Sequence, residues 1–558
     1  MWKKAMRVSS SISYRKRFKC PVCDSFSLYI IHDSACECEN GCDETLINIG
    51  SIFEKDEFNG YFTSDYIDKH FWIDDAEINK MFTAIVDDNR YNLLTEKEKQ
   101  TLKTILYSRT SKIEESLDDL VVRYLNDNEL TKVPQEMTEF GYMINLLEDT
   151  HFFMNLCCKD LALFNCGILF ADKQFYSGRF FYNNAIEHLF QVNERIYVIL
   201  GIVYNFNFKD ELSLNKNYKI EDYIKGIDDY KNSDIKNILD SLKGNHMYRT
   251  LNTIRKLNTH DLSYYSKKIE EEMNEDVIAA SKFWNRDGDA VDADFYLPQI
   301  KNLIFCLNKH YELFELILSK VSSLTNIEEH TSHPMITKFM KFQVTHFDKQ
   351  YSSKEIQQLE FEKIKIFNKL PQYNNIIIAD VFFRLNEVVR CVFDFCNMEN
   401  EIFYKEWIQR ENLHLYDLMD QQYLLYSAIS RIYSCYDKLS RYISERYPQY
   451  KDIKYFHDFK KKLDKSALSY IIVDILNDDY YEGLYDLRND IYHNLRAGTL
   501  HGEEGLVNFN YTLFIIVVEN TKKIMKLIDD LYEFKNQKIG RNEPCLCGSG
   551  LKSKKCCG

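Results

Sequence analysis

Glycine and proline are scarce in this chain, and their scarcity restricts its fold more than any other feature of the sequence. Only 18 glycines and 7 prolines occur among 558 residues, whereas ordinary proteins contain about 7% glycine and about 5% proline. These residues make the tight turns of sandwiches, barrels and doubly wound sheets. We therefore expect a mainly α protein built from long helices, and the 45% of residues that are hydrophobic suffice for large cores.

The net charge of the chain is −14, from 71 basic and 85 acidic residues. A protein that coats nucleic acid nonspecifically needs net positive charge, so this class is excluded, whereas a local basic site is compatible with the total. The longest apolar runs, at 196–203 and 513–518, are far shorter than the roughly 20 residues of a membrane span. We expect a soluble, cytoplasmic protein that makes no membrane contact.

Nine of the 16 cysteines cluster near the two ends of the chain. A disulfide framework would explain them in a secreted protein, but no signal peptide is recognisable, and a large lysine-rich chain favours a reducing cytoplasm. Zinc is the better explanation, because two closely spaced cysteine pairs supply the tetrahedron of thiolates that it binds. The other seven cysteines stand among apolar residues and are expected in the core.

The N-terminal cluster begins with Cys20-Pro-Val-Cys23, directly after a basic tail. A short strand is expected at Leu28–Ile31. Cys38 and Cys42 form the expected second pair, with Cys36 as the alternative ligand. This arrangement is similar to a zinc ribbon and implies one structural zinc ion.

The C-terminal cluster has the pattern Cys-x-Cys-x8-Cys-Cys, formed by Cys545, Cys547, Cys556 and Cys557. It resembles the SEC-C zinc module, which is best known as the C-terminal tail of the bacterial preprotein-translocase ATPase. The resemblance covers about 20 residues. It implies a second structural zinc ion and a docking role toward proteins, ribosome-associated ones among them, and it implies no catalysis.

An apolar stripe with helical spacing occurs twice in the chain, 243 residues apart. Its members are three or four residues apart, which places them on one helix face. Two neighbouring features also match: Ala185 corresponds to Ala428, and Glu194-Arg195 corresponds to Asp437-Lys438. Only the polar Asn193 interrupts the first copy. The members are Tyr182, Ile186, Leu189, Asn193, Ile196 and Leu200 in one copy and Leu425, Ile429, Ile432, Tyr436, Leu439 and Ile443 in the other.

Each stripe is followed by an Arg-x4-His motif, Arg255–His260 after the first and Arg488–His493 after the second. One such pair would be an ordinary coincidence, and a third, Arg496–His501, crosses Ala-Gly-Thr and is interpreted as one. Two motifs at corresponding places in a duplicated unit predict a shared role. Long amphipathic helices near Lys301–Val321 and Leu506–Phe534 are expected to complete the two repeats.

At this point the chain resembles the HEPN superfamily, small helical bundles whose nuclease members carry an Arg-x(4–6)-His motif, often with a polar residue after the arginine. The second copy fits, because Asn489 follows Arg488, whereas Lys256 takes that place in the first copy. The resemblance implies two HEPN-like helical bundles in tandem, flanked by small zinc-binding modules at both termini. Some relatives carry a modified tyrosine two residues beyond the histidine, and Leu262 and Leu495 at these positions do not indicate that scheme.

The residue types of the motif suit RNA cleavage without metal. Histidine exchanges protons near neutral pH and can act on the 2′-hydroxyl or the leaving 5′-oxygen, and arginine can stabilise the phosphorane. HEPN nucleases pair two motifs by dimerising. We therefore expect Arg255, His260, Arg488, Asn489 and His493 to line one cleft within a monomeric pseudo-dimer or a homodimer. The products would carry 2′,3′-cyclic phosphate and 5′-hydroxyl ends.

Two functions from different classes follow from these patterns. The first is an RNA-cleaving enzyme of bacterial antiphage defence or of a toxin system, an assignment that rests on the family resemblance. The alternative is a noncatalytic RNA-binding or protein-docking adaptor that uses its zinc modules. The expected organisation is a basic tail and ribbon at 1–50, a helical region at 51–135, bundles at 136–321 and 375–535 joined by a linker and helix at 322–374, and a zinc tail at 538–558.

Overall fold

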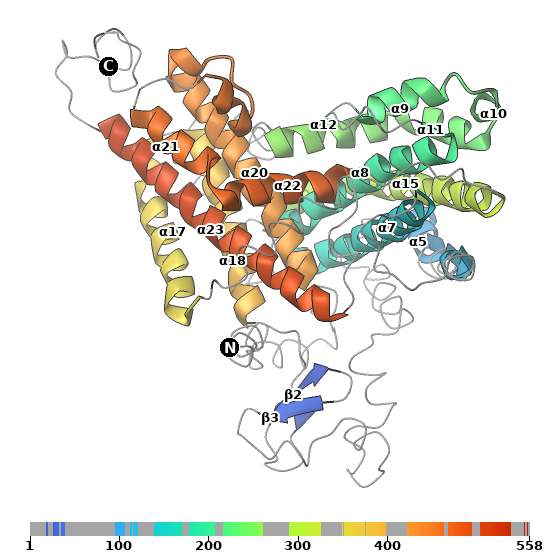
Figure 1. Ribbon diagram of the computed structural model, residues 1–558, viewed down its shortest axis with the longest axis horizontal. Helices are drawn as coiled ribbons and strands as arrows, with labels where there is room; N and C mark the ends of the chain where they lie inside the picture. The colour runs from blue at the N-terminus through green and yellow to red at the C-terminus, as the bar shows by residue number, and fades with distance from the viewer. Residues whose placement is uncertain are drawn as a thin grey trace. The chain divides into compact units, whose positions relative to one another are not determined.

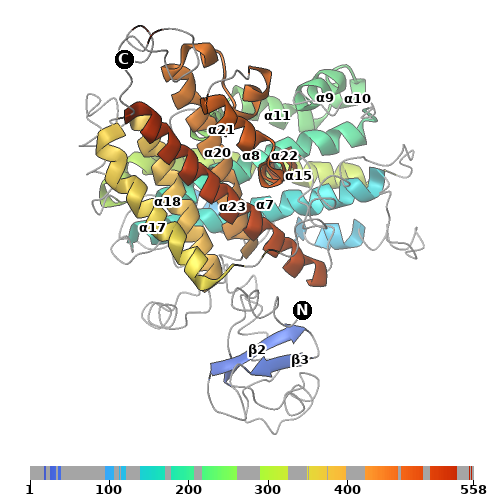
Figure 2. The same cartoon turned by 60° about the vertical axis from the view of Figure 1, so that its left-hand side comes forward.

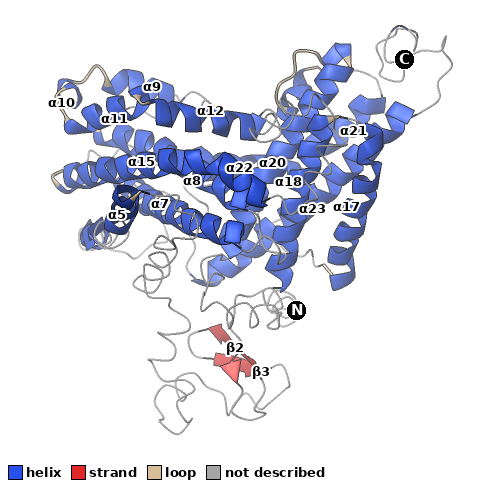
Figure 3. Cartoon of the chain, turned by 180° about the vertical axis from the view of Figure 1, so that it is seen from behind, coloured by secondary structure: helices blue, strands red, loops and turns tan. Residues whose placement is uncertain are grey.

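The computed structural model describes residues 18–19, 26–32, 35–38, 95–105, 112–113, 115–120, 139–169, 178–206, 216–260, 289–324, 349, 351–373, 375–397, 421–462, 467–493, 503–536, 552 and 555 (Figure 1). Most of these residues are helical, so the predicted mainly α class is confirmed (Figure 3). Contacts divide the chain into two units, Met1–Asp87 with Val392–Leu424 and Asp88–Cys391 with Leu425–Gly558. Each unit is described by itself.

The first unit contains a small antiparallel sheet with the strand order β1-β2-β3. Its strands are β1 (Phe18–Lys19), β2 (Phe26–His32) and β3 (Ala35–Cys38). The strand predicted at Leu28–Ile31 is therefore confirmed as part of β2. Leu28 pairs with Cys38 and Ile30 with Cys36 across β2 and β3.

The second unit contains a first series of helices, coloured blue to yellow-green in Figure 1. The helices α7 and α8 pack along each other, and α15, the longest helix of the series, packs against both of them. The helices α11 and α12 also contact α15. The series comprises α5 (Glu96–Thr104), α7 (Glu139–Leu169), α8 (Gly178–Val203), α9 (Lys216–Ile224), α10 (Asp228–Lys231), α11 (Asp234–Gly244), α12 (His246–His260) and α15 (Asp289–Ser322).

A second series of helices follows, coloured yellow to red in Figure 1. The helices α17 and α22 both pack against α23, and α22 also contacts α8 of the first series (Figure 2). The series comprises α17 (Ser353–Tyr373), α18 (Ile376–Asn397), α20 (Gln421–Arg446), the 3-10 turns η6 (Pro448–Tyr450) and η7 (Phe456–Lys461), α21 (Ala467–Leu476), α22 (Asp479–His493) and α23 (Glu503–Asn536).

Three helices of the second series repeat the lengths of three helices in the first. The central helices α8 and α20 both have 26 residues, the motif helices α12 and α22 both have 15, and α15 and α23 both have 34. The helices expected near Lys301–Val321 and Leu506–Phe534 are thus confirmed, and each is longer than predicted. The order central helix, motif helix, long helix is the same in both series.

Asparagine and aspartate start the two motif helices. Asn245 Oδ1 accepts the backbone N–H of Met247 at 2.8 Å, and Asp478 Oδ1 accepts that of Tyr480 at 2.9 Å. Each cap satisfies one of the four N–H groups that lack a partner at the start of a helix. The two caps occupy corresponding positions, so both motif helices begin at the same distance from their arginines.

Both apolar stripes lie in the core, as the sequence predicts. Every one of their members is buried, including the polar Asn193. Ala185 and Ala428 are also fully buried. The side chains of Cys157, Cys158, Cys306, Cys391 and Cys435 are buried free thiols, which confirms core packing for these five cysteines.

No helix in the described ranges is long and apolar enough to cross a membrane.

Truncating a stripe residue should destabilise the protein. Ile432 is fully buried in α20, and Ile432→Ala should lower the free energy of unfolding by about 2–5 kcal/mol through lost burial and a cavity. The control, Tyr470→Ala on the exposed side of α21, should change it by less than about 0.5 kcal/mol. Urea unfolding of both variants measures the difference, and equal midpoints would contradict the assignment of the stripe to the core.

Candidate functional site

The two motif helices place their arginines against the central helix of their own series. Arg255 of α12 lies over the ring of Phe190 in α8, with its Cζ 5.4 Å from the ring centroid. Arg488 of α22 lies over the ring of Tyr433 in α20 at 4.9 Å. The face of an aromatic ring attracts a cation electrostatically, so each motif arginine is held by an aromatic partner at a corresponding position.

Both arginines also reach one shared ring, that of Tyr492. The Arg488 Cζ lies 4.6 Å and the Arg255 Cζ 5.8 Å from its centroid. Tyr492 precedes His493 in α22 and is fully buried. The structure therefore brings together the arginines of two motifs that are more than 200 residues apart in sequence.

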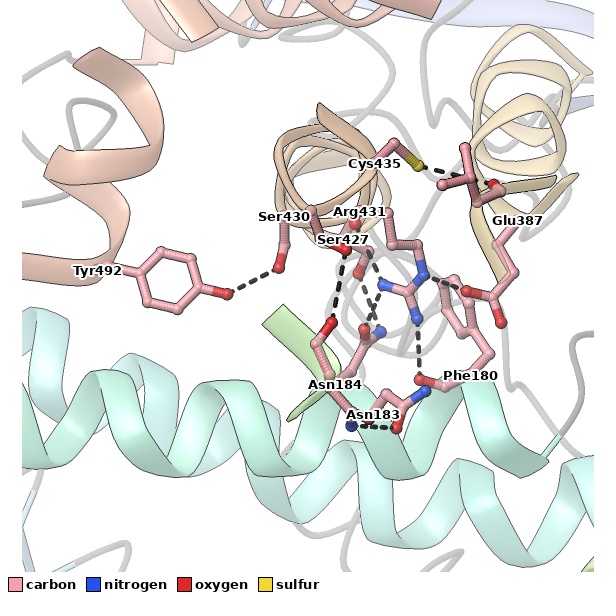
Figure 4. Close-up of polar contacts among 12 residues, drawn as sticks. Phe180, Asn183, Asn184, Glu387, Ser427, Ser430, Arg431, Cys435 and Tyr492 are labelled. Carbon is pink, nitrogen blue, oxygen red and sulfur yellow. Dashed lines mark hydrogen bonds and ion pairs between the residues drawn. The ribbon is translucent and has the colours of Figure 1, made fainter. Parts of the chain in front are cut away.

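The hydroxyl group of Tyr492 connects the two central helices. It donates to Glu187 Oε2 of α8 at 2.6 Å and lies 2.7 Å from the Ser430 hydroxyl of α20, the contact drawn in Figure 4. Burial and the neighbouring Glu187 raise the pKa of Tyr492, so the phenol stays neutral and keeps its proton. Since that proton goes to Glu187, the Ser430 hydroxyl donates to the phenol oxygen.

Glu187 also contacts the first motif. The Thr259 hydroxyl donates to Glu187 Oε1 at 3.1 Å, so one carboxylate links the residues that precede both motif histidines. Thr259–Glu187 and Tyr492–Ser430 occupy corresponding places in the two series.

The histidine of the first motif is paired with a carboxylate of the second series. His260 Nδ1 lies 2.9 Å from Asp437 Oδ2 of α20. Asp437 is buried, and its Oδ1 accepts the backbone N–H of Phe456 at 3.2 Å. A carboxylate that accepts from Nδ1–H directs the second ring nitrogen, Nε2, outward as the proton acceptor. Within the described ranges nothing hydrogen-bonds that nitrogen, and the His260 side chain is 34% exposed.

The arginine of the second motif is more deeply buried than that of the first. Arg488 is buried, and its Nη1 donates to Asn489 Oδ1 at 3.1 Å, so the predicted polar residue after the arginine orients it. His493 ends α22, and its side chain lies outside the described residues. The predicted pairing of His260 with His493 across one cleft therefore stays a prediction.

Each motif helix ends against a side chain of the other series. Arg195 of α8 is fully buried, and its Nη2 donates to the backbone oxygen of Ile491 at 2.8 Å. Ser434 of α20 donates to the backbone oxygen of Asn258 at 3.5 Å. The last four carbonyl groups of a helix have no partner within it, so these donors fix the positions of the helix ends.

Buried ion pairs anchor the two central helices to the helices that precede them. Arg195 Nε lies 3.5 Å from Asp149 Oδ2, and Lys438 Nζ lies 2.9 Å from Asp380 Oδ2. Arg195 and Lys438 are the corresponding members of the charged couples identified in the sequence. Burial lowers the pKa of the Lys438 ammonium group, which Asp380 opposes. These cations are structural, whereas their neighbour Asp437 contacts a motif histidine.

The zinc ligands expected from the sequence are not part of this site. Cys20, Cys23, Cys42 and the four C-terminal cysteines lie outside the described residues, and for Cys36 and Cys38 only the backbone of β3 is described. Across the described part of the chain, no group of three or more histidine, cysteine, aspartate or glutamate side chains could hold a metal ion.

Sequence reasoning identified the arginines and histidines but missed the residues that join them. No sequence pattern marks Glu187 or Tyr492, because glutamate and tyrosine are common residues on helices. Asp437 was recognised only as one member of a charged couple. Its place three residues after Ser434 on α20 gave no indication that it would meet His260.

Comparison with known proteins confirms the C-terminal motif. Residues 541–558 match the SEC-C motif family. The protein translocase subunit SecA of Carboxydothermus hydrogenoformans is 32% identical over 77 residues, 12% of this chain and 8% of the relative. SecA of Syntrophus aciditrophicus is 75% identical over 24 residues, 4% of this chain and 3% of the relative. The UPF0225 protein VV1358 of Vibrio vulnificus is 76% identical over 21 residues, which are 4% of this chain and 13% of the relative.

The chain thus spans only a small part of the relatives that it matches. No solved structure matches it. The SEC-C family is generally zinc-binding, which supports zinc at the C-terminal cysteines.

Removing the shared tyrosine should loosen the site. Tyr492→Phe leaves Glu187 and Ser430 without their hydroxyl partner and should lower the free energy of unfolding by about 1–3 kcal/mol. Tyr492→Leu also removes the ring that both guanidinium groups contact, so it should lower the free energy of unfolding further than Tyr492→Phe does. The control is Tyr470→Phe, which alters an exposed tyrosine. Chemical unfolding measures all three, and a Tyr492→Phe variant as stable as the wild type would rule out the bridging role.

Proposed function

We propose that the protein is a metal-independent endoribonuclease built from two HEPN-like repeats within one chain. The observation that carries the proposal is the convergence of Arg255 and Arg488 on Tyr492, together with the pairing of His260 to a carboxylate of the other series. A nuclease that needs two motifs would obtain both from one polypeptide. The equal helix lengths of the two series support the tandem arrangement.

The chemistry follows from the groups in place. His260, oriented through Nδ1 by Asp437, would take the proton of the RNA 2′-hydroxyl or give one to the leaving 5′-oxygen. His493 would perform the complementary step. The products would be a 2′,3′-cyclic phosphate and a 5′-hydroxyl, because the 2′-oxygen displaces the 5′-oxygen at phosphorus and no water enters.

The two arginines would have different tasks. Arg255 is half-buried and can contact a phosphate directly, so its forked donors would bind the crowded phosphorane. Arg488 is buried and bonded to Asn489, so it would supply positive potential behind the phosphate. Charge that is already in place when the transition state forms needs no reorganisation.

The biological setting and the terminal modules belong to the same proposal. The chain would act in bacterial antiphage defence or as a toxin, in the cytoplasm. Two structural zinc ions would be held by Cys20, Cys23, Cys38 and Cys42 and by Cys545, Cys547, Cys556 and Cys557. The SEC-C motif would dock the enzyme on a protein or ribosomal partner and take no part in cleavage.

Substituting the motif histidines tests the activity. His260→Ala and His493→Ala should each lower the rate of total-RNA cleavage by about 10²–10⁴-fold, the usual contribution of general acid–base catalysis. EDTA should leave the rate unchanged, and the fragments should carry cyclic-phosphate ends by mass spectrometry. The matched control is His246→Ala, an exposed histidine at the opposite end of α12. Cleavage that survives both motif substitutions would exclude the nuclease.

The SEC-C match favours one alternative, a noncatalytic adaptor that docks through its zinc modules. Two variants, compared by their cellular phenotype, distinguish an adaptor from a nuclease. An adaptor keeps its phenotype after combined His260→Ala and His493→Ala and loses it after deletion of residues 538–558. A nuclease loses it in the first case.

Zinc content tests the metal assignment independently. The purified protein should contain two zinc ions per chain by elemental analysis, because eight thiolates form two tetrahedral sites. Cys556→Ser should reduce the content to one ion and leave RNA cleavage unchanged. Cys435→Ala, which alters a buried core thiol, should leave the zinc content at two. A zinc content that Cys556→Ser does not change would contradict the C-terminal site.

A further inference from the structure

A short basic segment, Lys451–Lys462, lies between α20 and α21. It carries five exposed lysines and two aspartates, in a chain whose net charge is −14. Lys461 pairs with Asp458 at 2.7 Å and Lys462 with Asp452 at 2.9 Å. The other three, Lys451, Lys454 and Lys460, form no ion pair with any residue that the structure describes.

The basic segment is fixed in place by buried apolar residues. Ile453, Phe456 and Phe459 are all buried. The ring of Phe456 lies 4.9 Å from that of Tyr436 and 5.7 Å from that of Tyr481, so it packs against both α20 and α22. Because buried apolar residues alternate with exposed ones along the segment, the lysines face solvent while its backbone is anchored to the core.

The basic segment borders the proposed catalytic histidine. The ring of Tyr455 meets the ring of His260 edge-on, at 5.1 Å between centroids and 78° between planes. Its neighbour Phe456 donates its backbone N–H to Asp437, the carboxylate that orients His260. Tyr455 is nevertheless 41% exposed, which leaves part of its ring open to solvent beside His260.

The segment also extends toward the second motif helix. The ring of His457 stacks on that of Tyr485 in α22, at 4.5 Å and 19°. Burial, and then the positive charge of Lys460, lowers the pKa of His457, in agreement with a positive local potential. In the described part of the corresponding stretch of the first series stand α9–α11, where Lys225 pairs with Glu221 and Lys236 with Asp240.

We propose that the basic segment binds single-stranded RNA, with one base stacked on Tyr455 and the backbone along Lys451, Lys454 and Lys460. A basic track with an exposed aromatic ring is how proteins bind unpaired strands, because every base has a stacking face. A rigid duplex keeps its bases stacked on each other and cannot offer one to Tyr455. The inference rests on the proposed nuclease function and adds the class of its substrate and the side from which the strand enters.

Binding is measured separately from cleavage, with a fluorescein-labelled unstructured 20-nucleotide RNA on a His260→Ala background. Combined Lys451→Ser, Lys454→Ser and Lys460→Ser should weaken binding, and should reduce the slope of log affinity against log salt by about 2, at about 0.7 per lost phosphate contact. Combined Lys354→Ser, Lys365→Ser and Lys526→Ser on α17 and α23 removes the same charge from exposed lysines elsewhere. This control should leave the slope unchanged.

The aromatic ring is tested in the same assay. Tyr455→Leu should weaken binding of the single strand by about 5- to 150-fold, the range expected for one lost base–aromatic stack, and Tyr455→Trp should restore it. The same sequence as a duplex should bind more weakly and should not respond to Tyr455→Leu.

The outcomes distinguish the two proposals. Wild-type affinity in both the lysine and the Tyr455→Leu variants would overturn this inference and leave the nuclease standing. Loss of binding in those variants, together with cleavage that survives His260→Ala and His493→Ala, would overturn the nuclease and leave an RNA-binding segment.

Discussion

A buried arginine at the crossing of the two central helices sets the geometry on which the candidate site depends. Arg431 of α20 donates from Nε to Glu387 Oε2 at 2.5 Å, and from Nη1 to Asn184 Oδ1 of α8 at 2.7 Å (Figure 4). Its Nη2 donates to the Phe180 backbone oxygen at 3.2 Å. A buried charge is costly unless its donors are satisfied, so a shift of α8 along α20 would strand this guanidinium. The contacts therefore fix the register of the crossing.

The crossing has a further property, because Asn184 donates to Ser427 Oγ at 2.9 Å and these residues occupy corresponding positions in the two helices. A residue that contacts its counterpart in the other series lies where the two series meet face to face. Beyond that point each central helix contacts the motif helix of the other series. Arg195 of one then holds the end of α22, and Ser434 and Asp437 of the other hold the end of α12. Neither series contains a complete candidate site alone.

The sequence predicted the buried helix faces and the motif helices, but not the contacts that join residues distant in sequence. Burial of the stripes through Ile186 and Ile429 was predicted correctly, because the buried face of a helix returns every three or four residues. The motif helices were recognisable by two matching residue pairs. The contacts of Glu187, Tyr492 and Arg431 were not predictable, because each joins residues far apart in sequence through the crossing angle of helices, which no local pattern encodes. Asn193 shows the same limit, since it occupies a core position that periodicity alone assigns to an apolar residue.

The positions of the cations also explain how an acidic protein could handle an acidic substrate. Arg195, Arg431 and Lys438 are buried and pair with carboxylates, so they contribute little to the outer field. Unpaired positive charge at the surface of the second series is found in the basic segment, next to His260. An RNA strand repelled by acidic surface would be attracted at this segment, because screening confines each charge to about 8 Å at physiological salt. The net negative charge would then favour approach of the strand from the side on which His260, the proposed catalytic histidine, lies.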